Sequence, residues 1–310
     1  MPIDPFKFSE TLVKSSFNRY QQSLLITSTG ANKSSNLIIL LRLMSGGVKF
    51  RSINDSNYIR QDIDYLDLNN QFTAVSPLKK MTSYLAPALT VDELGRLFSD
   101  RRFVNSNYEF HKRLLNEFAN FLYFQKKESY TTAFIYIYRV LEMISIPFPL
   151  IYASKIEDFN SAFQFLKACT SDELTKENSK GELGVFRVFL RKLFENDPMK
   201  DLNINISIDP NFPNEVQKTY YKVLERMCGD ILDKSNCQEF DTLSVKFIEL
   251  NTLIINIRNR FFHLFSANRH NIQSDEIPNT DQFFKLINNH LASWIALIYF
   301  EVVKFSISKR

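Results

Sequence analysis

The sequence predicts a mainly α-helical protein, a helical bundle that carries a small N-terminal appendage of mixed α and β structure. Three observations carry this expectation. Residues 103–310 contain long segments in which apolar residues recur every three or four positions. Glycine and proline are sparse, at 7 and 10 of 310 residues. The hydrophobic fraction of 45%, with 29 Phe and 13 Tyr, is ample for a packed core.

The helices follow from this spacing in chain order. A first helix is expected over 103–127, where Lys, Arg and Glu separate the apolar positions. A second is expected over 129–146, ending before Pro147 and Pro149, because proline restricts helical continuation. Further helices are expected over 157–168, 182–195, 214–232, 241–265 and 280–306. The segment 201–213 alternates apolar and polar residues and fits a short strand or an irregular loop equally well.

The first 90 residues show a different pattern. The stretch SNLIILLRLMSGGVKFRSI at 35–53 has an apolar run, a glycine pair and then alternation, which indicates a hairpin or a helix, turn and strand. A further short strand is expected in QFTAVSPLKKM at 71–81. We therefore expect an N-terminal region of uncertain fold over 1–95 and a helical domain over 96–310.

Composition narrows the function classes. The formal net charge of +4 is too small to identify a nucleic-acid binder, although the N-terminal portion is modestly basic. Cys169, Cys228 and Cys237 are too widely spaced for a zinc site or a disulfide framework, so reduced thiols are expected. No secretory leader opens the chain, and apolar runs such as 291–300 are shorter than a membrane span. We expect a cytoplasmic protein that makes no membrane contact.

The stretch IRNRFFHLF at 257–265 is the strongest candidate site. Advancing 100° per residue from position 243 produces a regular buried stripe. Its members are Leu243, Phe247, Leu250, Ile254, Ile257, Phe261 and Phe265. Asn259 falls at about 160° and His263 at about 200°, opposite the stripe, whereas Arg258 lies on the flank at about 60°. A second apolar line of Ile248, Ile255 and Phe262 predicts contact with another helix or a second subunit.

These residue types suit metal-independent cleavage of RNA. Imidazole titrates near neutrality, so His263 can accept or donate a proton at physiological pH. The guanidinium of Arg258 offers a fork of donors that fits phosphate oxygens. The amide of Asn259, four residues before the histidine, can orient its ring or hold a substrate oxygen. The sequence holds no P-loop, GxGxxG, HExxH or GxSxG motif, and it suggests no cofactor and no metal.

The run from Arg258 to His263 resembles the Arg-x4–6-His motif of HEPN-superfamily ribonucleases, in the variant with Asn after the arginine. The resemblance covers roughly residues 103–310 and implies an all-α homodimer in which two copies of the motif form one RNA-cleaving site. It also implies a polar element on an earlier helix, for which YRVLEMIS at 138–145 supplies Arg139 and Glu142 as supporting residues. Such proteins commonly act as toxins or effectors of anti-phage defence, which a cognate inhibitor or an ATPase partner holds in check.

Other interpretations of these residues stay open. His263 fits a surface or interface histidine without chemistry, and Arg258 fits an ordinary ion pair with Glu142 or Glu249. Arg139 and Glu142 fit a local ion pair on one helix. At the level of the whole chain, the alternatives are a non-catalytic HEPN-like scaffold for interaction or nucleotide sensing, and a structural all-α adaptor.

Overall fold

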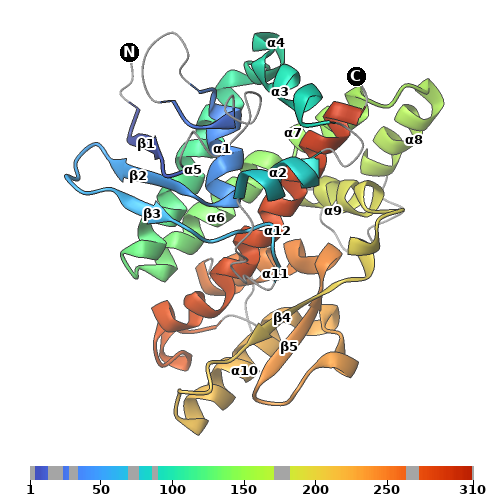
Figure 1. The fold of residues 1–310 in the computed structure, drawn as a ribbon. Coiled ribbons are helices and arrows are strands. Elements are labelled where there is room, and N and C mark those ends of the chain that lie inside the picture. Colours follow the sequence, from blue (N-terminus) through green and yellow to red (C-terminus); the bar gives the residue numbers. More distant parts are fainter. Residues whose placement is uncertain are drawn as a thin grey trace. The chain divides into compact units, whose positions relative to one another are not determined.

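The structure is a computed structural model that describes residues 4–12, 24–27, 34–68, 77–85, 90–170, 182–262 and 272–308. It is mainly helical with a small sheet near the N-terminus, as the sequence predicts (Figure 1). The chain divides into two compact units, the first of residues 1–140 with 295–310 and the second of residues 141–294. This division differs from the boundary expected near residue 95, because residues 1–95 share their unit with the long helix that follows them.

The elements are named here in chain order. The described helices are α1 (Asn36–Ser45), α2 (Pro77–Leu85), α3 (Val91–Ser99), α4 (Arg101–Val104), α5 (Tyr108–Lys126), α6 (Tyr130–Ile144), α7 (Pro147–Ser154), α8 (Phe159–Thr170), α9 (Glu182–Leu193), α10 (Asn214–Cys228), α11 (Leu250–Ile257) and α12 (Thr280–Ser308). The strands are β1 (Phe6–Glu10), β2 (Val48–Ser52), β3 (Ile59–Gln61), β4 (Asn203–Ser207) and β5 (Thr242–Lys246). A π-helical turn, Arg258–Phe262, follows α11 directly.

The sheet of the first unit has the strand order β1-β2-β3, with antiparallel neighbours. Between β1 and β2 the chain forms α1, whose first turn is capped by the Ser35 side chain, which accepts from the Ile38 N–H. Gly46 and Gly47 then reverse the chain into β2, which confirms a helix, turn and strand over 35–53. Gly46 has φ +83°, and a Cβ there would lie 3.0 Å from the Ile63 carbonyl oxygen, so the turn favours glycine.

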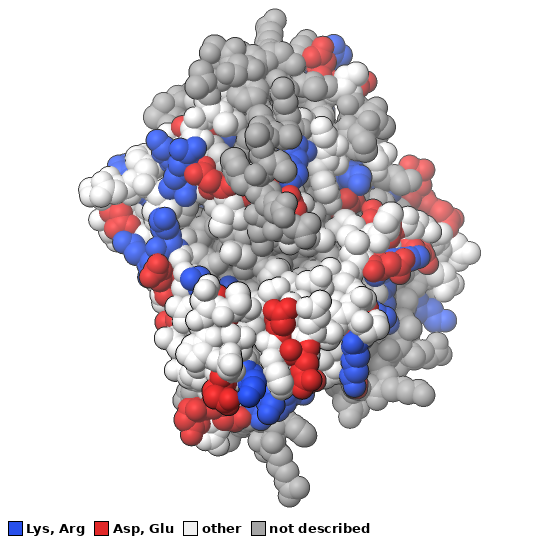
Figure 2. All heavy atoms as spheres, turned by 60° about the horizontal axis from the view of Figure 1, so that its bottom comes forward, with Lys and Arg blue, Asp and Glu red and all other residues white. Residues whose placement is uncertain are grey.

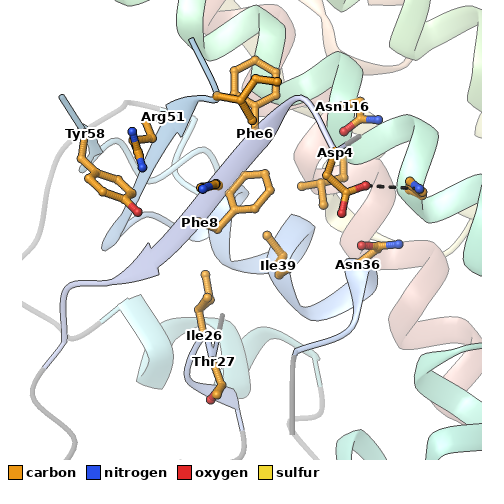
Figure 3. A pocket seen from close by; sticks show the side chains of 14 residues that line it. Asp4, Phe6, Phe8, Ile26, Thr27, Asn36, Ile39, Arg51, Tyr58 and Asn116 are labelled. Carbon is orange, nitrogen blue, oxygen red and sulfur yellow. Dashed lines mark ion pairs between the residues drawn. The ribbon is translucent and has the colours of Figure 1, made fainter. Parts of the chain in front are cut away.

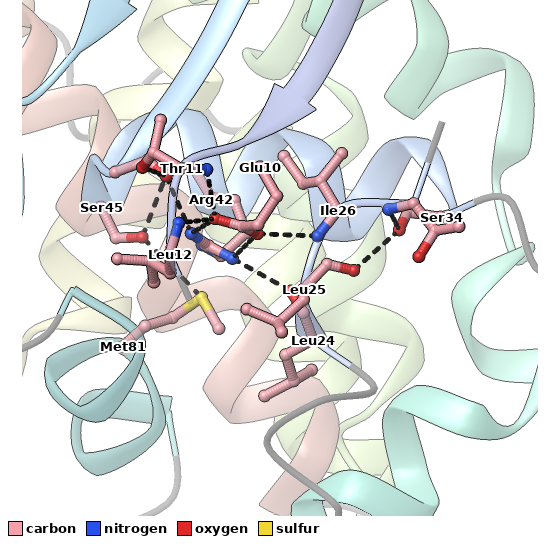
Figure 4. A network of polar contacts seen from close by, with 12 residues as sticks. Glu10, Thr11, Leu12, Leu24, Leu25, Ile26, Ser34, Arg42, Ser45 and Met81 are labelled. Carbon is pink, nitrogen blue, oxygen red and sulfur yellow. Dashed lines mark hydrogen bonds and ion pairs between the residues drawn. The ribbon is translucent and has the colours of Figure 1, made fainter. Parts of the chain in front are cut away.

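A buried ion pair ties β1 to α1 (Figure 4). The Arg42 guanidinium is fully buried and donates to both carboxylate oxygens of Glu10, at 2.7 and 3.0 Å. It also donates to the carbonyls of Leu24 and Gly47. Glu10 in turn accepts from three backbone N–H groups, those of Thr11, Leu12 and Ile26. The pair therefore fixes a helix, a strand end and the 24–27 segment together.

Helix α5 and the end of α12 complete the first unit. Helix α5 packs along α1 through a stripe of buried residues that includes Phe118 and Phe121, and both rings contact Tyr65. Near the start of the same buried stripe of α5, the His111 Nδ1 lies 2.8 Å from the Tyr299 hydroxyl of α12. The last residues of the chain therefore belong to the core built by the first 140.

The second unit holds a two-stranded sheet and corrects one prediction. The helix expected over 241–265 is wrong for Thr242–Lys246, which forms β5 and pairs with β4, with Ile206 opposite Leu243. Leu243 and Phe247 are four residues apart, which fits a helix, but Leu243, Val245 and Phe247 also alternate as in a strand. The segment forms a strand because β4 supplies an antiparallel partner for its backbone hydrogen bonds. This pairing also settles the segment 201–213, whose alternating part is a strand.

Prolines begin helices here where they were expected to end them. The helix over 129–146 ends at Ile144 as predicted, but α7 starts at once with Pro147 at its first position. A proline is tolerated there because its missing N–H would have no partner inside the helix. Pro77 likewise opens α2, so that the strand expected in 71–81 is a helix from residue 77 onward. Residues 71–76 of that stretch lie outside the described part of the chain.

Two described segments, 130–154 and 280–308, are long and apolar enough to cross a membrane by length and composition alone. Within α12, 72% of the most apolar window is buried inside the protein, against 44% for the 130–154 segment. Residues 291–300 are buried on every side of the helix, and the Trp294 indole N–H donates to the Phe247 carbonyl at 2.8 Å. A helix that is apolar all round is typical of a protein core, which meets the same length and composition criteria.

Candidate functional site

The candidate motif begins at the point where α11 changes to a π-helical turn. Helix α11 buries Leu250, Leu253, Ile254 and Ile257 completely, so its direction is fixed by the core of the second unit. From Arg258 onward the chain adopts π-helical geometry through Phe262. Such turns are rare and occur frequently at functional sites. The structure therefore places a local irregularity directly on the residues that the sequence singles out.

Aromatic packing holds one side of the π turn. The Phe261 and Phe262 rings lie 4.9 Å apart between centroids, and both contact Phe284 of α12, at 5.3 and 5.9 Å. Neither ring is fully buried, whereas Phe284 is. The second apolar line expected beside the motif thus includes a ring, Phe262, that packs on a neighbouring helix of the same chain.

Hydrogen bonds to α10 hold the other side. The Asn256 side-chain amide donates to the Met227 carbonyl at 2.8 Å, and the Arg260 guanidinium donates to the Arg226 carbonyl. Both carbonyls belong to the last turn of α10, where they have no partner within the helix. The Arg260 carbonyl itself accepts from the Ile272 N–H at 2.9 Å. Arg260 is therefore a structural residue that anchors the turn from both ends.

The structure brings Arg258 and Asn259 together. Arg258 Nη1 donates to Asn259 Oδ1 at 2.9 Å, and both residues are half-buried. The projection of an ideal helix separates these residues by 100°, but the long arginine side chain curls back to its neighbour. The bond joins the two side chains in a contact that the sequence analysis did not predict.

His263 lies outside the described residues, as do Phe265 and His270. The helical projection that placed His263 on one face with Asn259 does not apply to this stretch of the chain. It assumed one α-helix from 243 to 265, whereas the chain forms a strand, a short helix and a π turn over that stretch. The direction of His263 therefore stays a prediction from the motif.

The two supporting residues lie on α6, at the boundary between the units. Arg139 belongs to the first unit, where its guanidinium lies 2.8 Å from a carboxylate oxygen of Glu117 and over the Tyr136 ring. Burial raises the pKa of Glu117, and the charge of Arg139 counteracts this shift. Glu142 belongs to the second unit and is exposed. Arg139 thus has an ion pair with α5, in addition to any local interaction on its own helix.

Glu249, a considered partner of Arg258, is already engaged on α9. Its two carboxylate oxygens accept from Arg187 at 2.7 Å and from Arg191 at 2.8 Å. Glu249 is almost fully buried, and it is the residue that directly precedes α11. This double ion pair fixes where α11 begins, and hence where its π turn lies.

The two described histidines, the buried Cys228 thiol and the half-buried Cys169 thiol all have pKa values shifted away from neutral pH. Burial lowers the pKa of His111 and of His290 to about 4, so both imidazoles are neutral. Burial raises the pKa of Cys228 to about 12 and that of Cys169 to about 11, so both thiols are protonated. Among the described residues, no three His, Cys, Asp or Glu side chains gather as metal ligands would.

Charge on the surface is mixed on the face shown in Figure 2, where the described basic and acidic side chains intersperse in small groups. Arg226 of α10, whose carbonyl accepts from Arg260, forms an ion pair with Glu276 through its side chain.

Comparisons of this chain with models of protein families, with curated proteins and with solved structures find no match. The resemblance to HEPN ribonucleases therefore rests on the motif and on the helical character of the chain.

Proposed function

We propose that the protein is a metal-independent endoribonuclease of the HEPN type. The observation that carries this proposal is the hydrogen bond between Arg258 and Asn259 on a π-helical turn, five residues before His263. An arginine that an amide holds in place presents its guanidinium in a defined direction, which binding of a phosphate requires.

The proposed chemistry divides between two side chains. His263 removes the proton of a 2′-hydroxyl or protonates the leaving 5′-oxygen, because imidazole titrates near neutral pH. Arg258 stabilises the charge that develops on the phosphate. Asn259 positions Arg258 and does not itself take part in proton transfer. The products are a cyclic phosphate end and a free 5′-hydroxyl end.

The biological setting is part of the proposal. Two copies of the motif would meet in a homodimer, so that one histidine serves as base and the other as acid. The enzyme would act in the cytoplasm as a toxin or effector of anti-phage defence, under the control of a cognate inhibitor or ATPase partner. A non-catalytic scaffold is the alternative that the experiments below separate from this function.

The first experiment incubates end-labelled RNA with the full-length protein in EDTA. Wild type should cleave the RNA and leave a cyclic phosphate, and His263→Ala should lose roughly 10²–10⁴-fold in rate. His270→Ala is the matched control, because it removes an imidazole seven residues further along the chain. Equal inertness of wild type and His263→Ala, or cleavage only with added metal, contradicts the proposal and favours the scaffold.

A second experiment separates the roles of the neighbouring residues. Arg258→Lys keeps the charge but loses the planar fork, and should reduce the rate by about 10²-fold with little effect on folding. Asn259→Ala should reduce it by about tenfold, and the loss should be small when Arg258 is already Lys. Additive losses in the double variant would show that Asn259 does not act through Arg258.

A further inference from the structure

The first unit contains a cavity of about 510 Å³ that the proposed ribonuclease site does not use. It lies beside β1, an edge strand of the sheet, and is also lined by residues of α1 and α5. Figure 3 shows Arg51 and Tyr58 at one end and Asp4, Asn36 and Asn116 at the other. This volume is within the roughly 300–1,000 Å³ of clefts that bind small molecules.

The cavity carries an excess of positive charge. Lys7, Arg51 and Lys112 line it, against a single carboxylate, that of Asp4. Asp4 is 3.2 Å from the Lys112 ammonium and is therefore paired with it. Within the described part of the chain, neither Lys7 nor Arg51 has a carboxylate partner; Arg51 Nη1 donates to the carbonyl of Asp55 at 2.6 Å.

Lys7 and Arg51 are also direct cross-strand partners in the β1–β2 pairing. Opposed side chains on one face of an antiparallel pair lie close together, and like charges there are destabilising. Lys49 faces Arg60 in the next strand pair, but Arg60 forms an ion pair with Asp62 at 2.7 Å. The repulsion between Lys7 and Arg51 has no such compensation among the described residues, and an anion would supply it.

Two hydrogen-bond donors at this cavity lack acceptors. Within the residues that the structure describes, Asn36 Nδ2 and Arg51 Nε are buried atoms without a hydrogen-bond partner, and both residues line the cavity. Buried polar groups in native proteins nearly always have partners, so an unmet donor needs an explanation. Both groups are donors, which matches a ligand rich in acceptor oxygens.

The remaining lining suits a flat apolar body. The Tyr58 ring is partly exposed, and the Arg51 guanidinium lies 5.2 Å from its centroid. Phe8, Ile26 and Ile39 form the apolar floor between the two polar ends. A phosphate alone would fill only a small part of this space.

We propose that this cavity binds a nucleoside 5′-monophosphate, with its phosphate at Lys7 and Arg51 and its base on the apolar floor. The inference does not rest on ribonuclease activity, because its test measures binding alone. The same phosphate-and-base unit occurs as a free nucleotide and as the 5′-phosphorylated end of an RNA, and the experiment distinguishes these sources.

The test is titration calorimetry on the full-length protein with AMP, adenosine, ribose 5-phosphate and inorganic phosphate as separate probes. AMP should bind about tenfold more tightly than any of its parts, because only AMP meets both the cations and the floor. A 5′-phosphorylated trinucleotide is the further arm, and tighter binding than AMP would identify an RNA end as the source. Equal binding of phosphate and AMP, or no binding of any probe, overturns the proposal.

Variants locate the ligand. Lys7→Ala and Arg51→Gln should each weaken AMP binding by about tenfold, and the loss should shrink at high salt. Lys49→Ala is the matched control, because it removes an exposed lysine from the same strand as Arg51 but outside the cavity. Its AMP affinity should equal that of wild type. Unchanged affinity in Lys7→Ala and Arg51→Gln would place any AMP site elsewhere and contradict the inference.

Discussion

The two ends of strand β1 differ in how their charged side chains are paired. At its C-terminal end Glu10 and Arg42 form a buried pair in which each charged group meets an opposite charge and backbone partners. Near its N-terminal end Lys7 faces Arg51, a like charge, at the rim of a cavity. The balanced end holds three chain segments together, whereas the unbalanced end is suited to accept an anion. The difference separates charge that builds the fold from charge that is available for binding.

The largest effect should come from breaking the balanced end. Arg42→Met leaves the Glu10 carboxylate without its cation and should lower the free energy of unfolding by about 3–5 kcal/mol. Arg60→Met is the control, because its ion pair with Asp62 is exposed and should contribute less than about 1 kcal/mol. Urea unfolding measures both. Similar losses in the two variants would contradict a structural role for the Glu10–Arg42 pair.

A smaller effect should appear on acidification. Burial alone raises the pKa of Glu10, but the hydrogen bond and charge of Arg42, with backbone N–H bonds, outweigh burial and lower the pKa below its ordinary value of 4.5. A lowered carboxyl pKa adds stability that is present above the ordinary value and lost as the pH falls through the lowered one. Wild type should therefore lose more stability than Glu10→Gln between neutral pH and about pH 3. Parallel losses in thermal melts would count against this assignment.

The smallest effect has the opposite sign. Lys7→Ala removes the repulsion with Arg51 and should raise the stability of the ligand-free protein by about 0.5 kcal/mol. Lys49→Ala should change it less, since Arg60 opposite it is balanced by Asp62. Differential scanning calorimetry without added nucleotide checks both variants. A loss of stability in Lys7→Ala would show that this lysine stabilises the ligand-free fold, which contradicts the expected repulsion with Arg51.

Much of the helical fold could be predicted because it depends on local spacing. Helix α5, helix α12 and the helix, turn and strand over 35–53 follow from periodicity and a glycine pair. Strand β5 could not, because Leu243 and Phe247 fit a helix until β4, almost forty residues earlier in the chain, supplies the partner. The start of α7 at Pro147 could not be predicted either, because a proline is compatible both with the end of one helix and with the first position of the next.

The candidate sites show the same limit. The motif at Arg258 and Asn259 is contiguous, so the sequence could point to it, but not to the bond between the two side chains or to the π turn. Asn256 and Arg260 anchor that turn to α10, but their partners are about thirty residues away in the chain, so no sequence motif indicates this role. The Lys7–Arg51 pair was missed entirely, because two residues 44 positions apart become neighbours only through strand register.

The composition of the first unit has a consequence for how the protein is made. Its core includes residues 295–310, among them Tyr299, which bonds to His111. During synthesis at about 5–20 residues per second, residues 1–140 emerge roughly 10–30 s before that segment is translated. The second unit is contiguous in sequence, and its last residues, 280–294, form the first half of the same helix α12 that the first unit uses. The first unit can therefore be completed only after the second unit has been translated, although most of its own residues are translated first.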